Sequence, residues 1–309
     1  MHDGQNLFDA NSTWNHQAWE IDSVLGSLIA DKKVKPAIVV GIHSVDTTRI
    51  GDLMPERVVE MTPPGEVRDF IDIICRSQYR ADEYLSFIVN TLKPTIDSHF
   101  STLTDRKSTS IMGSSMGGLI SIYGVTEHPE VFGAAVCMST HWTGAIGDNA
   151  DFPTAMKYYL MDKFPRNGDY LLYFDNGDCP YDSNYIPAYE MMNRLFDFLG
   201  YHEGDRLKTG IFHGHSHSEK SWSERVNIPL QFILKVVTSS GKYTYSITRT
   251  FEKPVISNTD FTSGLRFFNT KRPPDAANNL WVESTTRKPA ELTYCNFSQL
   301  KTIAEHLPI

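Results

Sequence analysis

Short runs of β-branched and apolar residues alternate with amphipathic stretches along the chain, up to about residue 237. The runs have the length of single strands, and the stretches between them carry apolar residues at helical spacing. Strands and helices that alternate in this way form a mostly parallel sheet with helices on both faces. The predicted strands span 37–42, 108–112, 134–138, 170–174 and 208–212, and the predicted helices span 18–29, 81–96, 119–125 and 188–199.

The pattern changes after residue 237. Residues 238–309 are rich in Ser, Thr and Asn, carry prolines at positions 254, 273, 274 and 289, and contain only short β-like stretches such as 243–248. We therefore expect an α/β domain over residues 1–237 and a β-rich extension packed on it over residues 238–309.

Composition excludes several classes of protein. The 309 residues are 40% hydrophobic and 21% charged, which suits a folded globular chain. The net charge of −8 is spread along the chain, so no basic face for nucleic acid is predicted. No apolar stretch has the length of a membrane span, and the N-terminus has neither the basic nor the apolar region of a signal peptide. The 4 cysteines form no C-x-x-C pair, so the compartment stays unassigned.

The segment Gly113-Ser114-Ser115-Met116-Gly117 matches G-x-S-x-G, the pattern of a nucleophile elbow. In such an elbow the chain turns from strand to helix so sharply that side chains at the flanking glycines would collide with the backbone. Chance gives this pattern in about one chain in ten of this composition. The predicted strand before it and helix after it indicate a real elbow, with Ser115 as the nucleophile.

A serine hydroxyl needs a base within hydrogen-bond reach and an acid that orients the base. In this architecture the acid and then the histidine follow the serine along the chain, each after a later strand. Histidines 213, 215 and 217 follow the last predicted strand. Ser216 and Glu219 have capping-box spacing, which predicts a helix starting at Ser216 with His217 as its first residue. This favours His217 as the base over His215 and His213.

An alternative for the three histidines is a metal site, because alternate residues of an extended segment face the same way. The predicted helix start and the lack of a further ligand cluster argue against it. For the acid, Asp175, Asp178 and Asp182 all follow the strand 170–174. Asp175 in Asp-Asn-Gly suits a turn. The residues themselves do not decide between Asp178 and Asp182.

Six motifs between residue 1 and about 237 stand out together. They are His2-Asp3-Gly4-Gln5-Asn6-Leu7-Phe8, Trp19, Gly113-Ser114-Ser115-Met116-Gly117-Gly118, Pro129-x-x-Phe132, the loop 175–182, and His217-Ser218-Glu219-x-x-Trp222-x-x-Arg225. Taken together, these motifs resemble the putative-esterase branch of the α/β hydrolases, which includes feruloyl and acetyl-xylan esterases, enterochelin esterases, S-formylglutathione hydrolase and mycolyltransferases.

The resemblance implies the α/β-hydrolase fold, with Ser115 as nucleophile and His217 as base. It ranks Asp182 above Asp178 as the acid, because Asp182 stands five residues after Gly177 and is followed by Tyr185. The implied oxyanion hole consists of the backbone N–H groups of Met116 and Gln5. The chain departs from the family at its start, because relatives have two or three strands before the His-Asp-Gly-Gln loop.

We also expect Asp3 and the aromatic residues Trp14, Trp142 and Trp222 to lie near the substrate. The predicted function is a serine carboxylic-ester hydrolase that needs neither cofactor nor metal and acts on a small-molecule, carbohydrate-linked or siderophore-like ester. The alternatives are an acyltransferase of the same mechanism and a catalytically inactive binding protein on the hydrolase fold. The sequence does not predict an oligomeric state.

Overall fold

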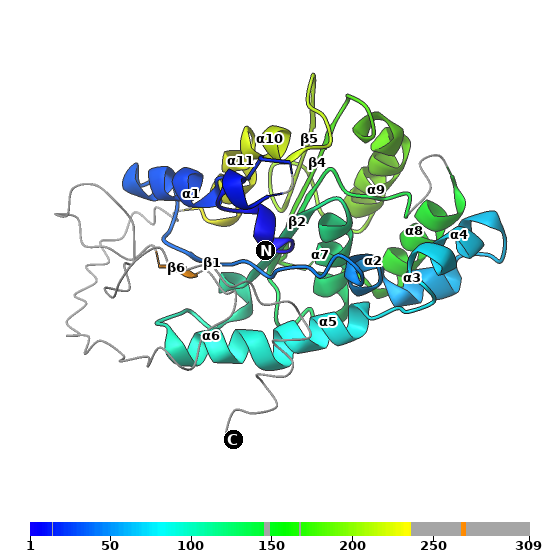
Figure 1. The fold of residues 1–309 in the computed structure, drawn as a ribbon, viewed down its shortest axis with the longest axis horizontal. Coiled ribbons are helices and arrows are strands. Elements are labelled where there is room, and N and C mark those ends of the chain that lie inside the picture. The colour runs from blue at the N-terminus through cyan, green and yellow to red at the C-terminus, as the bar shows by residue number, and fades with distance from the viewer. Residues whose placement is uncertain (14, 145–148, 167, 236–266, 270–309) are drawn as a thin grey trace.

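The central sheet of the computed structural model has 4 parallel strands in the order β2-β3-β4-β5 (Figure 1). Its strands are β2 (Ser110–Ser114), β3 (Ala134–Met138), β4 (Leu171–Gly177) and β5 (Leu207–Phe212). Each lies within two or three residues of a predicted strand. The structure describes residues 1–13, 15–144, 149–166, 168–235 and 267–269. The prediction of a mostly parallel sheet is confirmed.

Side chains of successive strand residues point to opposite faces of the sheet, as the geometry of a strand requires. Ile111, Cys137 and Phe174 belong to the larger core cluster, whereas Met112 and Tyr173 belong to the smaller one on the other face. Both faces are therefore buried at the centre of the sheet, which explains why β3 appears in the sequence as a continuous apolar run. The edge strand β5 is only partly buried and carries Lys208 and Thr209.

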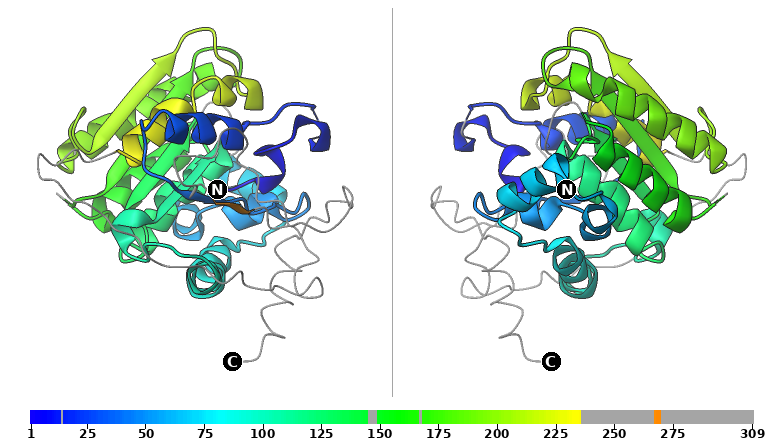
Figure 2. Two further views of the ribbon diagram at one scale, coloured as in Figure 1. Left: turned by 90° about the vertical axis from the view of Figure 1, so that its left-hand side faces the viewer. Right: turned by 90° about the vertical axis from the view of Figure 1, so that its right-hand side faces the viewer.

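Helices cover both faces of the sheet (Figure 2). The larger cluster is covered by α2 (Arg49–Leu53), α3 (Glu56–Met61), α4 (Glu66–Ile74), α5 (Ala81–Phe87), α6 (Lys93–His99), α7 (Met116–Glu127), α8 (Asp151–Lys163) and α9 (Ile186–Phe198). The smaller cluster is covered by α1 (Ile21–Ala30), α10 (Glu219–Ser223) and α11 (Asn227–Ile233). Short helical turns are formed by Gly4–Asn6, Ala10–Ser12, Ile88–Leu92, Arg106–Ser108 and Asp182–Tyr185. Among these, α2, α3, α4, α8 and α11 were not predicted from the sequence.

The first residues of the chain lie between β2 and β1 (Ile38–Val40), beside the central sheet (Figure 1). The His2 N–H donates to the carbonyl of Met112 at 3.0 Å, and the Gly4 N–H donates to that of Ile42 at 2.7 Å. A side chain at Gly4 would collide with the backbone of Gly41 and Ile42, so this close approach requires glycine. The loop after His2 is thereby fixed beside the end of β2.

The predicted extension over residues 238–309 lies outside the described residues except for β6 (Phe267–Asn269), which pairs antiparallel with β1. Its β-rich character and the domain boundary at 237 stay predictions. Cys75, Cys137 and Cys179 are free thiols. Within the described ranges, no helix is both long and apolar enough to cross a membrane.

Candidate active site

Ser115 stands at the sharp turn between β2 and α7, as the elbow motif predicts. Its backbone angles of φ 57° and ψ −123° lie outside the regions that L-residues ordinarily adopt. A Cβ at Gly113 would lie 2.8 Å from the backbone of Gly117, so the strand and the helix are packed too closely for a side chain there. The structure therefore gives a direct steric reason for the first glycine of the motif.

The turn presents Ser115 at the carboxyl edge of the sheet. The Ser115 N–H donates to the carbonyl of Met138 at 3.0 Å, which fixes the elbow against the end of β3. The Ser115 carbonyl in turn accepts from the His141 N–H at 3.2 Å. Among the described residues, no hydrogen bond links the Ser115 hydroxyl to His217. Such contacts are often long in the absence of substrate and tighten when it binds.

His217 and Asp182 form a close pair beyond the ends of β5 and β4. The His217 Nδ1 lies 2.5 Å from Asp182 Oδ1, and the Asp182 side chain is 0% exposed. Asp182 Oδ2 also accepts from the Ser139 hydroxyl at 2.6 Å and from the Gly177 N–H at 2.9 Å. Burial alone would raise the pKa of Asp182, but its hydrogen bonds to His217, Ser139 and Gly177 hold it below its usual value. Asp182 is thus an ionised carboxylate that orients the His217 ring.

Ser139 connects this pair to a second buried layer. Its hydroxyl accepts from the Trp222 indole N–H at 3.0 Å and from Arg225 Nη2 at 2.8 Å, while it donates to Asp182. Arg225 is 1% exposed and binds both carboxylate oxygens of Asp175 at 3.1 Å. The interpretation of Asp175 as a turn residue was wrong, because it lies within β4 and is the buried counter-ion of Arg225.

The alternative acid, Asp178, contacts a different histidine. Its Oδ2 lies 2.7 Å from His213 Nδ1, and its Oδ1 accepts from the Gly214 N–H at 2.7 Å. The His213 side chain is 87% exposed. The hydrogen bonds from His213 and Gly214 lower the pKa of Asp178. Asp178 thus supports the loop after β5, whereas among the described residues Asp182 is the aspartate in contact with His217.

The helix that follows the histidines begins later than predicted. α10 starts at Glu219, and its N-cap is Ser218, whose hydroxyl accepts from the Ser221 N–H. The predicted start at Ser216 was wrong because Ser216 lies in the loop and the serine two residues later caps the helix. His217 therefore lies in the loop before the helix.

The rings of the three histidines diverge. His215 Nδ1 lies 3.2 Å from both the Ser221 carbonyl and Arg225 Nη1, whereas His213 and His217 contact separate aspartates. Within the described part of the chain, no group of three or more His, Cys, Asp or Glu residues could hold a metal ion.

The predicted oxyanion-hole residues lie on short helical elements. Met116 is the first residue of α7, and Gln5 lies in the turn Gly4–Asn6. Among the described residues, the N–H groups of Met116 and Gln5 have no hydrogen-bond acceptor. The Gln5 side chain is fixed by Ser44, donating to its hydroxyl at 2.7 Å and accepting from its N–H at 3.1 Å.

Asp3, a predicted substrate contact, lies beside this turn in the left-handed conformation, with φ 51°. Arg49 binds both of its carboxylate oxygens, at 2.6 and 2.7 Å. Burial raises the pKa of Asp3, but the charge and hydrogen bonds of Arg49 outweigh that effect and lower it. The ion pair fastens the loop that carries Gln5 to α2.

The tryptophans predicted near the substrate differ in their surroundings. Trp142 is 0% exposed and packs edge-on against Phe174 in the larger core, so it could touch a ligand only after its neighbours move. Trp222 packs edge-on against His217, with ring centroids 5.0 Å apart, and supports that ring. Trp14 lies outside the described residues.

The sequence analysis missed two residues of this edge, Ser139 and His141. Both directly follow the predicted strand 134–138, and the carboxyl ends of parallel strands meet at one edge of a sheet. That rule could have found them. His141 Nδ1 lies 2.5 Å from the Tyr185 hydroxyl, and the Tyr185 ring contacts that of His217 with centroids 5.7 Å apart.

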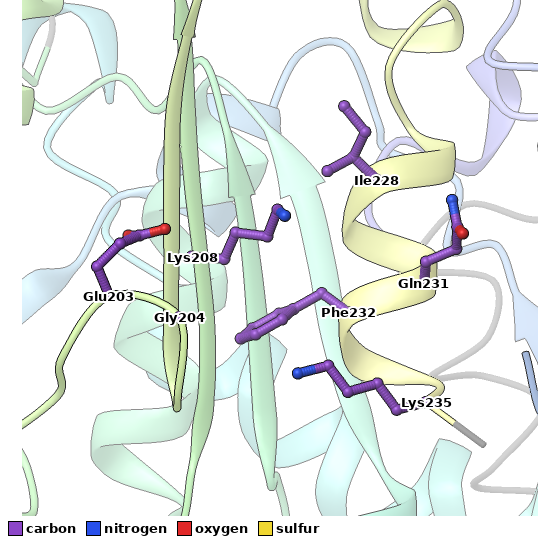
Figure 3. A pocket seen from close by; sticks show the side chains of 7 residues that line it. All are labelled: Glu203, Gly204, Lys208, Ile228, Gln231, Phe232 and Lys235. Carbon is purple, nitrogen blue, oxygen red and sulfur yellow. The ribbon is translucent and has the colours of Figure 1, made fainter. Parts of the chain in front are cut away.

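A pocket of about 400 Å³ lies elsewhere, between β5 and α11 (Figure 3). It is lined by Glu203, Gly204, Lys208, Ile228, Gln231, Phe232 and Lys235. Glu203 and Lys208 lie at the amino end of β5, whereas His217 follows its carboxyl end. The pocket is therefore separate from the candidate active site.

The parallel sheet, the elbow and the paired loops define an α/β fold of the hydrolase type. Residues 1–184 match the model of the family described as "Putative esterase", and the chain belongs to that family. The resemblance stated from the motifs is confirmed. The family match and the relative described next support the prediction of an esterase-type hydrolase.

One curated relative is an endo-1,4-beta-xylanase/feruloyl esterase of Xylanibacter ruminicola, 26% identical over 154 residues. The match covers 48% of this chain and 18% of that protein, so the chain spans only a small part of it.

Among solved structures, the BES protein from Bacillus cereus is similar with a TM-score of 0.52 and 19% identity, covering 76% of this chain and 81% of that one. The enterobactin esterase FES from Shigella flexneri is similar with a TM-score of 0.53 and 17% identity, and the match covers 75% of this chain and 51% of that one. At these identities the two likenesses show the fold.

Proposed function

We propose that the protein is a serine carboxylic-ester hydrolase in which Ser115 is the nucleophile, His217 the base and Asp182 the acid. The observation that carries the proposal is the buried, multiply hydrogen-bonded contact between Asp182 and His217 at the same sheet edge as the Ser115 elbow. Family membership supports the reaction class. A carboxylate that fixes the imidazole so that its other nitrogen faces a serine is the arrangement that activates a hydroxyl.

In the first half of the reaction, Ser115 Oγ attacks the carbonyl carbon of the ester while His217 Nε2 takes the hydroxyl proton. Asp182 stabilises the imidazolium that forms. The tetrahedral intermediate then collapses, the bond to the alcohol oxygen breaks, and His217 gives its proton to the departing alcohol. The acyl group is left on Ser115.

In the second half, water takes the place of the alcohol. His217 removes a proton from the water as its oxygen attacks the acyl carbon, and Ser115 leaves as the hydroxyl when His217 returns the proton. The products are a carboxylic acid, an alcohol and the free enzyme.

The N–H groups of Met116 and Gln5 would stabilise the oxyanion in both halves. Each is without an acceptor among the described residues, and each is held by rigid backbone or side-chain contacts. Donors fixed in advance cost no reorganisation when charge develops, and one such donor contributes about 3 kcal/mol to lowering the barrier.

The proposed substrates are acyl esters of carbohydrates or siderophore-like esters. The names of the similar proteins, a feruloyl esterase and an enterobactin esterase, support this class. Asp3 and Trp222 lie beside the site, and with Trp142 they stay proposed substrate contacts. A screen of acetyl, butyryl, feruloyl and siderophore esters would identify the acyl group.

The test is the Ser115→Ala variant with p-nitrophenyl acetate as substrate. We expect hydrolysis to fall by at least about a thousandfold, because the covalent route is lost, while circular dichroism shows an unchanged fold. Turnover at the wild-type rate would contradict the proposal. Product analysis with an added acceptor alcohol separates the hydrolase from an acyltransferase.

A further inference from the structure

His141 is a second histidine at this edge of the sheet, and the proposed reaction does not use it. It lies in the segment that follows β3, and its backbone N–H donates to the Ser115 carbonyl at 3.2 Å. The charges of His217 and Arg49 both act on its ring. His217 belongs to the loop after β5, whereas Arg49 holds the loop that carries Gln5. The ring therefore lies within electrostatic range of both sides of the candidate active site.

The Tyr185 hydroxyl lies where it can donate to one ring nitrogen of His141. The Tyr185 hydroxyl lies 2.5 Å from His141 Nδ1. Burial raises the pKa of Tyr185, so its hydroxyl keeps its proton and can donate it. Burial, followed by the charges of His217 and Arg49, lowers the pKa of His141 to about 3, so its ring is neutral at pH 7. A neutral imidazole that accepts at Nδ1 must carry its proton on Nε2.

The Nε2–H group of His141 is an available donor. No described residue accepts a hydrogen bond from this nitrogen. The nitrogen is also not fully buried, because it is absent from the buried side-chain atoms without a hydrogen-bond partner. The Nε2 of His2, in contrast, is buried and has no hydrogen-bond partner among the described residues. Nε2 of the half-buried His141 ring can therefore donate to a ligand when Nδ1 accepts from Tyr185.

We propose that His141 is a specificity residue that donates a hydrogen bond from Nε2–H to an oxygen of the substrate outside the scissile ester. The inference rests on the proposed function. The acceptor is a hydroxyl or carbonyl oxygen, carried by either the acyl group or the alcohol. A site that places a donor for one oxygen discriminates against substrates that lack it.

Two matched pairs of esters test the proposal and distinguish its two sources of oxygen. 4-Nitrophenyl 3-hydroxybutyrate and 4-nitrophenyl butyrate differ by a hydroxyl on the acyl group. 2-Hydroxyethyl butyrate and ethyl butyrate differ by a hydroxyl on the alcohol. For each pair the quantity measured is the ratio of kcat/KM for the hydroxylated ester to that for the plain ester.

The variants His141→Asn and His141→Gln separate the two ring nitrogens. The Asn side chain can still accept from Tyr185 but does not extend to the position of Nε2, whereas the Gln amide reaches that position. We expect the ratio to fall about tenfold in His141→Asn for one of the two pairs, the size of one lost hydrogen bond, and to be partly kept in His141→Gln. His213→Asn, at an exposed histidine, is the matched control and should leave the ratio unchanged.

Ratios that are the same in wild type and His141→Asn for both pairs would overturn the proposal. An independent readout is the ring ¹⁵N spectrum of His141, which should show the Nε2–H form at pH 7; a proton on Nδ1 would also overturn it. Failure of the proposed function is distinguishable, because it would appear as hydrolysis of the plain esters that survives in Ser115→Ala.

Discussion

Two His–Asp pairs connect the loops that follow β4 and β5, and they differ in burial and in the hydrogen bonds around them. In one, His217 and Asp182 have side-chain exposures of 18% and 0%. In the other, His213 and Asp178 have exposures of 87% and 31%. The two Nδ1–carboxylate distances are close, at 2.5 and 2.7 Å. Distance alone therefore does not identify the pair that can activate a serine.

The surroundings of the two aspartates make the difference. Asp182 accepts from Ser139 and Gly177 as well as from His217, and Ser139 is itself held by Arg225 and Trp222. The other pair is largely open to water, where ion pairs contribute little and side chains reorient. A buried, fully hydrogen-bonded carboxylate fixes an imidazole in one orientation. The comparison predicts that equal substitutions in the two pairs have very unequal effects.

The largest contrast is expected between His217→Gln and His213→Gln. The first removes the proposed base, and we expect kcat to fall by about a thousandfold or more. The second changes an exposed ring, and kcat should stay within about twofold, as for most surface substitutions. Steady-state hydrolysis of p-nitrophenyl acetate measures both. Equal losses in the two variants would show that the buried pair has no special role.

The acids provide the second contrast. Asp182→Asn preserves the shape of the side chain but allows the wrong imidazole tautomer, and kcat should fall by about a hundredfold to ten-thousandfold. Asp178→Asn should lower it by no more than a few fold, because Asp178 supports only the loop after β5. If the Asp178 variant were the more damaged of the two, Asp178 and not Asp182 would be the acid.

Ser139→Ala tests the layer beneath the buried pair. The variant removes a donor to Asp182 and leaves Arg225 Nη2 and the Trp222 N–H without this acceptor. We expect kcat to fall about tenfold and the free energy of unfolding to fall by about 1–3 kcal/mol, the cost of buried groups left unsatisfied. Chemical denaturation and kinetics on the same preparation measure the two effects. Wild-type values for both would show that Ser139 does not position Asp182.

The last effect acts on stability and not on catalysis, and it depends on pH. Burial lowers the pKa of His2 and His141 to about 3, from 6.5 for an exposed histidine. Below pH 6.5 the unfolded chain binds protons that the folded state does not, so stability falls as the pH is lowered from 6.5 toward 3.

The expected slope is about 1.4 kcal/mol per pH unit for each histidine. In His141→Gln, the slope of the unfolding free energy against pH should lose the part due to His141 and keep the part due to His2. Urea denaturation between pH 4 and 7 measures this slope. An identical slope in the variant would show that His141 takes up its proton equally in the folded and unfolded states.

The sequence predicted the sheet and the elbow well for physical reasons. Strands buried on both faces must be continuously apolar, and the turn at Ser115 requires glycine at position 113. Helices such as α2 and α3 were missed because they are short, at 5 and 6 residues, and span too few turns to show a clear period. Their helical state depends on packing against the core.

The sequence predicted the site residues that belong to motifs and missed those that do not. The choice between Asp178 and Asp182 depends on burial, which the residues of the loop do not encode. Both Ser216 and Ser218 could cap the helix that follows, and the spacing from Ser216 to Glu219 predicted the wrong serine as the N-cap. Ser139 and His141 belong to no motif, because their roles arise when β3 and β4 lie in register.

The most direct test of the account is labelling by a fluorophosphonate followed by peptide mass spectrometry. The reagent reacts only with an activated serine hydroxyl. We expect one adduct, on Ser115, formed at least about a hundredfold more slowly in His217→Gln and at the wild-type rate in His213→Gln. An adduct on another residue, or undiminished labelling of Ser115 in His217→Gln, would contradict the claim that the buried His217–Asp182 pair activates Ser115.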